Sequence, residues 1–401
     1  MRFVLDAGQR AFADSLDAML TAAGTPSVVR EWSRGEHGSG RALWSRIAEA
    51  GVFALTVPEE YGGLGAGPVE LVVAFVELGR HAVPGPLVET VAATALLLGL
   101  DDPGPAERLL PTLASGESTA TLVPQQATFA PSRRPARSPT ASRAWDVPPV
   151  AAPAESPGTS STRTSHRPAE STHRTPLLEG QTLPAGARAP GPYALDADMA
   201  DVRLTTPEPL TAPPGTTDLY LAPAVRAAEV HRSLDPARRL FRLPLGGELL
   251  ASGPQVAGAA AHALATGRLA TAAQALGVGL TLLDRTVVHV GQRSQFGVPV
   301  GSFQAVKHRL ADAKIALEFA RAVLFGAALT MAAADVAAAK VTACEAAYTT
   351  ARTALQLHGA IGYTAEYDLS LWLTKARALR TAWGGPRECR ALVLSGGDRR
   401  W

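Results

Sequence analysis

Apolar and polar positions alternate with helical spacing along the first part of the chain. From Asp6 to about Ala23, apolar residues recur at intervals of three and four. A further helix is expected at about 69–80, and the turn at Pro84-Gly85-Pro86 leads into one that ends near Leu100. Ser39 is expected to cap a short helix between these segments. The pattern predicts an α-helical N-terminal domain over residues 1–123.

The last part of the chain is also helical in pattern. A long run of small residues begins at about residue 257, with Gly277 and Gly279 as interruptions, and a loop follows at 293–301. Gly359 has the position of a glycine that ends a helix, and Thr364 that of an N-cap residue. We predict a four-helix C-terminal bundle over residues 251–401, with its second and third helices at about 303–333 and 336–357.

The middle of the chain, residues 124–250, loses this pattern. Short apolar runs separated by Pro, Gly and Thr predict a small, β-barrel-like domain, with runs at 202–204, 219–221, 241–243 and 249–250. The fold class expected from the whole chain is therefore mostly α with a small central β-domain.

Residues 125–190 form a stretch of aberrant, low-complexity composition within this middle domain. Pro, Ala, Ser, Thr and Arg dominate it, Lys is absent, and neither a strand nor a helix period is visible. Two explanations are open: a low-complexity insertion that replaces strands, or a segment read out of frame in a GC-rich gene. The clean return of ordinary sequence on each side favours the second explanation.

Overall composition excludes several classes of function. Hydrophobic residues make up 46% of the 401 residues, and the formal charge is only +2, which argues against nucleic-acid binding. Cys344 and Cys389 lack metal-ligand spacing, so neither a metal site nor a disulfide framework is expected. The N-terminus lacks the apolar core of a signal peptide, and no uncharged apolar run is long enough to span a membrane. We expect a cytoplasmic protein.

Two motifs in the C-terminal part carry a family resemblance. The first is Arg293-Ser294-Gln295-Phe296-Gly297, followed by Phe303-Gln304, and the second runs from Leu355-Gln356-Leu357-His358-Gly359 to Glu366. Together with Val57–Gly65 and Glu77-Leu78-Gly79-Arg80, they resemble the acyl-CoA dehydrogenase family in the right order. The resemblance covers about 1–123 and 190–401, and it implies that family's three-part fold.

The resemblance also implies an FAD site. Arg293 supplies a planar cation suited to the pyrophosphate, while a glycine backbone can approach the cofactor closely. In the family these motifs reach a neighbouring subunit's flavin, so a homo- or hetero-oligomer, a dimer or a tetramer, is implied. The expected cofactor-binding residues are Arg293, Gln295, Phe296, Gln304, Gln356, Gly359 and Gly362.

The catalytic glutamate of the family is missing from both of its usual positions. Counting from Glu366 places Trp383 at the commoner position, and the alternative position falls on Gly267, just before Arg268. Neither residue can accept a proton, and Glu388 lies too far along the chain to be assigned. The catalytic residue is therefore left unknown.

The resemblance implies an activity, the α,β-dehydrogenation of an acyl-CoA thioester to the 2,3-enoyl-CoA. Electron-transfer flavoprotein or a similar protein would be the acceptor, and a partner subunit would supply the base, as in the actinobacterial heterotetrameric relatives that this chain resembles. Two alternatives are a non-catalytic FAD-binding or scaffold subunit and a different flavin reaction on the same scaffold.

Overall fold

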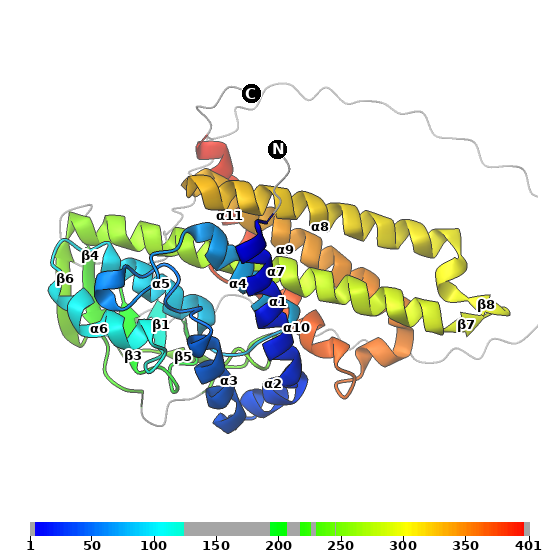
Figure 1. Cartoon of the computed structure of the whole chain (residues 1–401), viewed down its shortest axis with the longest axis horizontal. Coiled ribbons are helices and arrows are strands. Elements are labelled where there is room, and N and C mark those ends of the chain that lie inside the picture. Colours follow the sequence, from blue (N-terminus) through cyan, green and yellow to red (C-terminus); the bar gives the residue numbers. More distant parts are fainter. Residues whose placement is uncertain (1–4, 124–192, 207–216, 226–229, 245, 397–401) are drawn as a thin grey trace, which may run out of the picture. The chain divides into compact units, whose positions relative to one another are not determined.

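The computed structural model describes residues 5–123, 193–206, 217–225, 230–244 and 246–396. Within these ranges the chain is mostly helical with a small β region, which confirms the predicted fold class (Figure 1). The aberrant stretch at 125–190 lies outside the described residues. Among the helices that are described, none combines the length and the apolar character needed to cross a membrane.

Six α-helices form the N-terminal part, and most begin near the expected residues. Asp6 caps the first, since its carboxylate accepts from the Gln9 backbone at 2.8 Å. Ser39 is not an N-cap as predicted, because its hydroxyl donates to the Glu31 carboxylate and the helix begins one residue earlier. The helices are α1 (Ala7–Ala22), α2 (Thr25–Ser33), α3 (Gly38–Glu49), α4 (Pro68–Arg80), α5 (Leu87–Leu98) and α6 (Gly104–Ala114), with the 3-10 turn η1 (Glu59–Tyr61) between α3 and α4.

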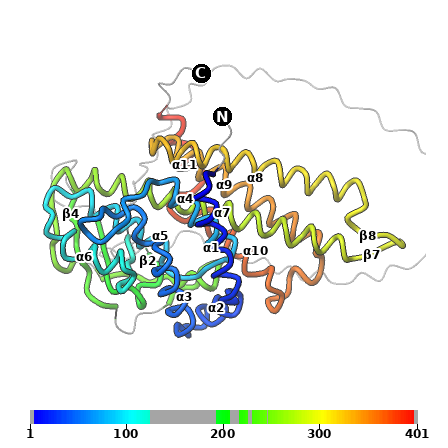
Figure 2. The backbone as a smooth tube through the Cα atoms, in the orientation of Figure 1, coloured from blue at the N-terminus to red at the C-terminus, as the bar shows by residue number. Residues whose placement is uncertain are grey.

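The C-terminal part consists of three long helices and two short ones. The long helices α7, α8 and α9 pack against each other (Figure 1), and Figure 2 traces the connections between them. Gly277 and Gly279 do not interrupt α7, which is continuous. Thr364 is not the N-cap of the fourth helix, which starts five residues later, after Asp368. The elements are α7 (Pro254–Gln292), β7 (Ser294–Gln295), β8 (Val298–Pro299), η2 (Val300–Ser302), α8 (Gln304–Thr330), α9 (Ala333–His358), η3 (Gly359–Tyr363), α10 (Leu369–Leu379) and α11 (Pro386–Ser395).

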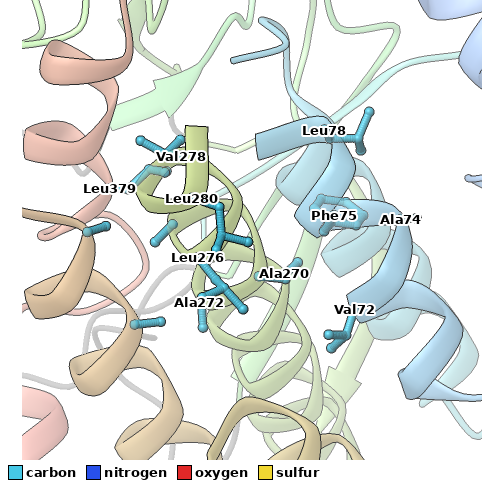
Figure 3. Close-up of a cluster of buried hydrophobic side chains, with 14 of the residues drawn as sticks. Val72, Ala74, Phe75, Leu78, Ala270, Ala272, Leu276, Val278, Leu280 and Leu379 are labelled. Carbon is cyan, nitrogen blue, oxygen red and sulfur yellow. The ribbon is translucent and has the colours of Figure 1, made fainter. Parts of the chain in front are cut away.

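Glycines set the close packing between α4 and α7. A Cβ on Gly277 would lie 2.0 Å from the Val76 carbonyl oxygen, and one on Gly79 would lie 2.2 Å from the Gln274 carbonyl oxygen. These distances leave no room for a side chain, so the two backbones meet directly. Figure 3 shows the resulting apolar cluster, in which α4 contributes Phe75 and α7 contributes Leu276.

A four-stranded sheet forms the main part of the β region. Its strand order is β1-β3-β4-β6, where β1 pairs with β3 in parallel and the other neighbours are antiparallel. All four predicted strand runs fall within, or overlap, observed strands, while the predicted domain boundaries at 123/124 and 250/251 stay a prediction. The strands are β1 (Ala120–Val123), β3 (Val202–Thr205), β4 (Thr217–Leu221) and β6 (Glu248–Gly253), and a separate pair is β2 (Tyr193–Leu195) with β5 (Leu240–Arg242).

Candidate functional site

A small hairpin at the end of α7 carries the first motif. Phe296 and Gly297 form its two-residue turn with φ values of 54° and 78°, as in a type I′ turn. Such a backbone is unfavourable for a bulky residue. Phe296 is nevertheless 93% exposed, and its ring forms an edge contact with Phe303 at 6.3 Å between ring centroids. A strained aromatic residue in this position is suited to contact with another chain.

The two expected cofactor motifs meet at Arg293. Its Nη1 donates to the carbonyl oxygen of His358 at 3.1 Å, which places the guanidinium beside the turn of the second motif. Gly359 has a φ of 66°, and a Cβ there would lie 3.5 Å from the same Nη1. No carboxylate is paired with Arg293 in the part of the chain that the structure describes. The remaining donors of a guanidinium beside an open backbone suit a phosphate.

The remaining residues expected to bind the cofactor are three glutamines and Gly362. Gln356 accepts a hydrogen bond from the Arg309 guanidinium, and Gln295 donates to the adjacent Ser294 carbonyl oxygen at 2.8 Å. Gln304 is exposed at the first residue of α8. Gly362 is buried in η3, where a Cβ would lie 3.2 Å from the Cβ of His358. Their roles toward FAD stay predictions.

A pair of stacked histidines underlies the second motif and was not foreseen. The rings of His289 and His358 are 4.1 Å apart, and Nδ1 of His358 donates to the Ala354 carbonyl oxygen at 2.8 Å. Burial lowers the pKa of both imidazoles, and the nearby Arg293 lowers that of His289 further. His358 is thus a fully buried residue at the end of α9.

The two positions expected for the base converge in space. Trp383 lies in the turn between α10 and α11, and a Cβ on Gly267 would lie 2.3 Å from its ring atom Cε3. The indole therefore fills the space next to Gly267. Its Nε1 donates to Oε1 of Glu89 at 3.1 Å.

Arg268 and Glu388 complete the surroundings of Trp383. The Nε of Arg268 donates to the Trp383 carbonyl oxygen at 3.1 Å, and its Nη2 forms a close ion pair with Glu388. Glu388 therefore neutralises a buried guanidinium, which gives it a structural role.

Glu89 is the acidic residue near this place that the sequence reasoning missed. It is 4% exposed, and its Oε2 has no hydrogen-bond partner among the described residues. Arg238 lies 3.6 Å from Oε1. The signal was present in the sequence, because Glu89 is the one charged residue in the otherwise apolar and neutral run Leu87–Leu98.

One group of potential metal ligands is found among the described residues. Atoms of Asp17, Glu77 and His81 lie within 4.8 Å of one another. His81 is already hydrogen-bonded to Asp17 at 2.8 Å, and Glu77 lies 3.5 Å from Arg80. Burial raises the pKa of Glu77 to about 7. Since an adjacent cation opposes a metal ion, we assign no metal to this group.

Family models match both terminal parts of the chain. The family model "Acyl-CoA dehydrogenase, N-terminal domain" matches residues 6–117, and "Acyl-CoA dehydrogenase, C-terminal domain" matches residues 257–395. The chain is 28% identical over 366 residues to acyl-CoA dehydrogenase IpdE2 of Mycobacterium tuberculosis, covering 90% of this chain and 89% of that protein.

The fold is shared with solved structures, of which two illustrate the likeness to this chain. The ChsE4-ChsE5 complex from Mycobacterium tuberculosis superposes with a TM-score of 0.73 at 23% identity and full coverage of both chains. A glutaryl-CoA dehydrogenase from Mycobacterium smegmatis in complex with FADH2 has a TM-score of 0.71 at 16% identity, covering 99% of this chain and 97% of that one. Both terminal parts match the same family and the fold agrees along the chain, so this protein belongs to the acyl-CoA dehydrogenase family.

Proposed function

We propose that this chain is a subunit of an FAD-dependent acyl-CoA dehydrogenase that converts an acyl-CoA thioester to the 2,3-enoyl-CoA. A partner subunit supplies the base, and electron-transfer flavoprotein or a similar protein takes the electrons. The proposal includes a cytoplasmic location, which fractionation of the source cells tests. The observation that carries it is the meeting of the two expected cofactor motifs at Arg293 and Gly359.

The residues near Arg293 fit an FAD pyrophosphate. A guanidinium held by one bond to the His358 carbonyl oxygen keeps further donors for phosphate oxygens. Gly359 has a φ of 66°, which favours a residue without a side chain, so no Cβ lies beside the Arg293 guanidinium. When bound, FAD supplies the acceptor for the hydride that leaves the β-carbon. The related structure with FADH2 supports this choice of cofactor.

A partner subunit is supported by two independent features. The expected base positions hold Trp383 and Gly267, neither of which can take the α-proton. Burying a Phe side chain stabilises a protein by about 1.5–3 kcal/mol. The ring of Phe296 nevertheless lies in solvent, so this stabilisation is left unused in the single chain. The chain therefore lacks a proton acceptor at these positions and presents an unburied contact residue. The related structure from Mycobacterium tuberculosis is a complex of ChsE4 with ChsE5, which is in keeping with such an assembly.

Reduction of the flavin by substrate tests the proposal. The chain is purified alone and together with a partner subunit, and acyl-CoA thioesters are added without oxygen. Bleaching of the flavin in the complex, and none in the chain alone, is expected. Full activity of the chain alone would remove the need for a partner. FAD-free protein in both preparations would leave the scaffold alternative, and bleaching by another class of substrate would favour a different flavin reaction.

A further inference from the structure

A cavity of about 350 Å³ lies between α1, α4, α7 and α8. Its volume falls in the range of small-molecule sites in proteins, which is about 300–1,000 Å³. The cavity is lined neither by the residues expected to bind FAD nor by the two expected base positions. It is therefore separate from the candidate site described above.

The buried side chains that line this cavity are all apolar. Leu276 and Leu280 come from α7, where Figure 3 shows them, Val73 comes from α4, and Phe325 comes from α8. Ala13 of α1 adds a small, half-buried methyl group. A hydrocarbon group placed against this apolar wall would be removed from water, which favours its binding.

Charged groups complete the lining of the cavity, and cations predominate among them. They are the guanidinium groups of Arg10, Arg80 and Arg321 and the carboxyl group of Glu77. Arg80 lies 3.5 Å from Glu77 and 3.2 Å from Asp284, so carboxylates already balance its charge. Burial raises the pKa of Glu77 to about 7, although Arg80 and Arg321 oppose this shift. The cavity therefore carries a positive charge.

Arg10 and Arg321 keep donors that a ligand can use. Arg10 donates to the Leu5 carbonyl oxygen at 2.9 Å and forms no ion pair within the described part of the chain. Arg321 lies 3.9 Å from Glu318, and these side chains are 41% and 44% exposed, so the pair is weak. A guanidinium has five N–H donors in a geometry that matches a carboxylate. Two such groups, one on α1 and one on α8, thus face the same apolar cavity.

We propose that this cavity binds a small carboxylic acid with a hydrocarbon tail. The carboxylate pairs with Arg10 and Arg321, and the tail lies along the apolar wall formed by α4, α7 and α8. An inorganic anion would leave this wall unused, and a neutral hydrocarbon would leave the guanidinium donors unused. The inference goes beyond the proposed function and does not depend on it, because the cavity shares no residue with the expected flavin site.

Calorimetric titration of the purified full chain at about pH 8 tests the ligand class. The probes are octanoate, octanol, which lacks the charge, and acetate, which lacks the tail. Octanoate is expected to bind at about one molecule per chain, and octanol and acetate about 10-fold more weakly or less. Absence of octanoate binding overturns the proposal, as does equal affinity for octanoate and either of the other probes.

Variants of the full chain test the location. Ala13→Phe places a ring in the cavity and is expected to abolish octanoate binding. Arg321→Gln is expected to weaken it about 10-fold, whereas Arg352→Gln, an exposed change on α9, serves as the matched control and should leave it unchanged. Octanoate affinity that stays the same in folded Ala13→Phe or in Arg321→Gln overturns the proposal. Where circular dichroism shows that Ala13→Phe fails to fold, Arg321→Gln against its control decides.

Glu77→Gln supplies an independent test of the charge. At about pH 8, above its pKa of about 7, the Glu77 carboxyl is ionised and repels a bound carboxylate. Glu77→Gln removes this charge and is expected to tighten octanoate binding several-fold, while octanol binding stays the same. Unchanged or weaker octanoate binding in this variant overturns the proposal. None of these titrations measures flavin reduction, so this proposal and the proposed function fail separately.

Discussion

Replacing Asp196 with Asn should remove a large pH dependence of stability. The Asp196 carboxyl is fully buried, where Oδ1 accepts from Nε1 of Trp32 at 3.2 Å and Oδ2 has no hydrogen bond in the described part of the chain. Burial raises the pKa of Asp196 from 3.8 to about 8, and the negative charges of Glu89 and Asp198 add to the shift. The folded protein therefore holds a proton that the unfolded chain releases.

The direction and size of this pH dependence follow from the linkage between proton binding and folding. A raised folded-state pKa gives stability that is present below the unfolded value of 3.8 and is lost as the pH rises toward about 8. At about 1.36 kcal/mol per pKa unit, the loss from this group between about pH 5 and about pH 8 is about 4 kcal/mol. Asn cannot ionise, its oxygen can accept from Trp32, and it tolerates the φ of 46° found here.

Urea unfolding followed by circular dichroism at about pH 5 and about pH 8 measures the effect. Asp196→Asn is expected to lose about 4 kcal/mol less than the natural chain between these conditions, with Asp101→Asn, an exposed change, as the control. Equal losses of unfolding free energy in the natural chain and Asp196→Asn would contradict a raised pKa of Asp196. They would mean that this carboxyl is ionised in the folded protein at both pH values.

Three further changes probe the site and the fold. Arg293→Ala should weaken FAD binding about 10- to 100-fold, measured by fluorescence titration, and Arg293→Lys less; equal affinity in all three proteins would contradict the phosphate role. Phe296→Ser should weaken subunit association in sedimentation velocity while the monomer's melting temperature is kept; unchanged association would exclude the hairpin from the interface. Gly277→Val should cost about 3 kcal/mol in urea unfolding, because its Cβ would lie 2.0 Å from the Val76 carbonyl oxygen; an unchanged midpoint would contradict the close backbone contact.

The helices and strands were largely predictable because their patterns are local. Apolar spacing located α1 and α4, and the apolar runs located β3 and β4, since each depends on neighbours within the same segment. The cap at Ser39 was wrong because Ser39 lies inside α3, where its hydroxyl donates to Glu31 on α2 and does not accept from a backbone N–H of the helix start. The start of α10 was wrong because the 3-10 turn η3 extends the preceding connection.

Only those site residues that belong to recognisable sequence motifs could be predicted. Arg293 and Gly359 were found because each belongs to a recognisable motif, although their contact had to come from the structure. The convergence of Trp383 and Gly267 depends on how α7 packs beside the turn after α10, which no local pattern encodes. Glu89 was visible as a lone charge in an apolar helix, but its partner lies at the other end of the chain.

Under the proposed function, this chain takes part in acyl-CoA dehydrogenation only with a partner subunit. The most direct measurement is the flavin absorbance of the chain, alone and co-purified with its partner, before and after anaerobic addition of hexanoyl-CoA or palmitoyl-CoA. Bleaching is expected in the complex, and none is expected in the chain alone. Bleaching of the chain alone to the same extent, or an FAD-free complex, would contradict the proposed function.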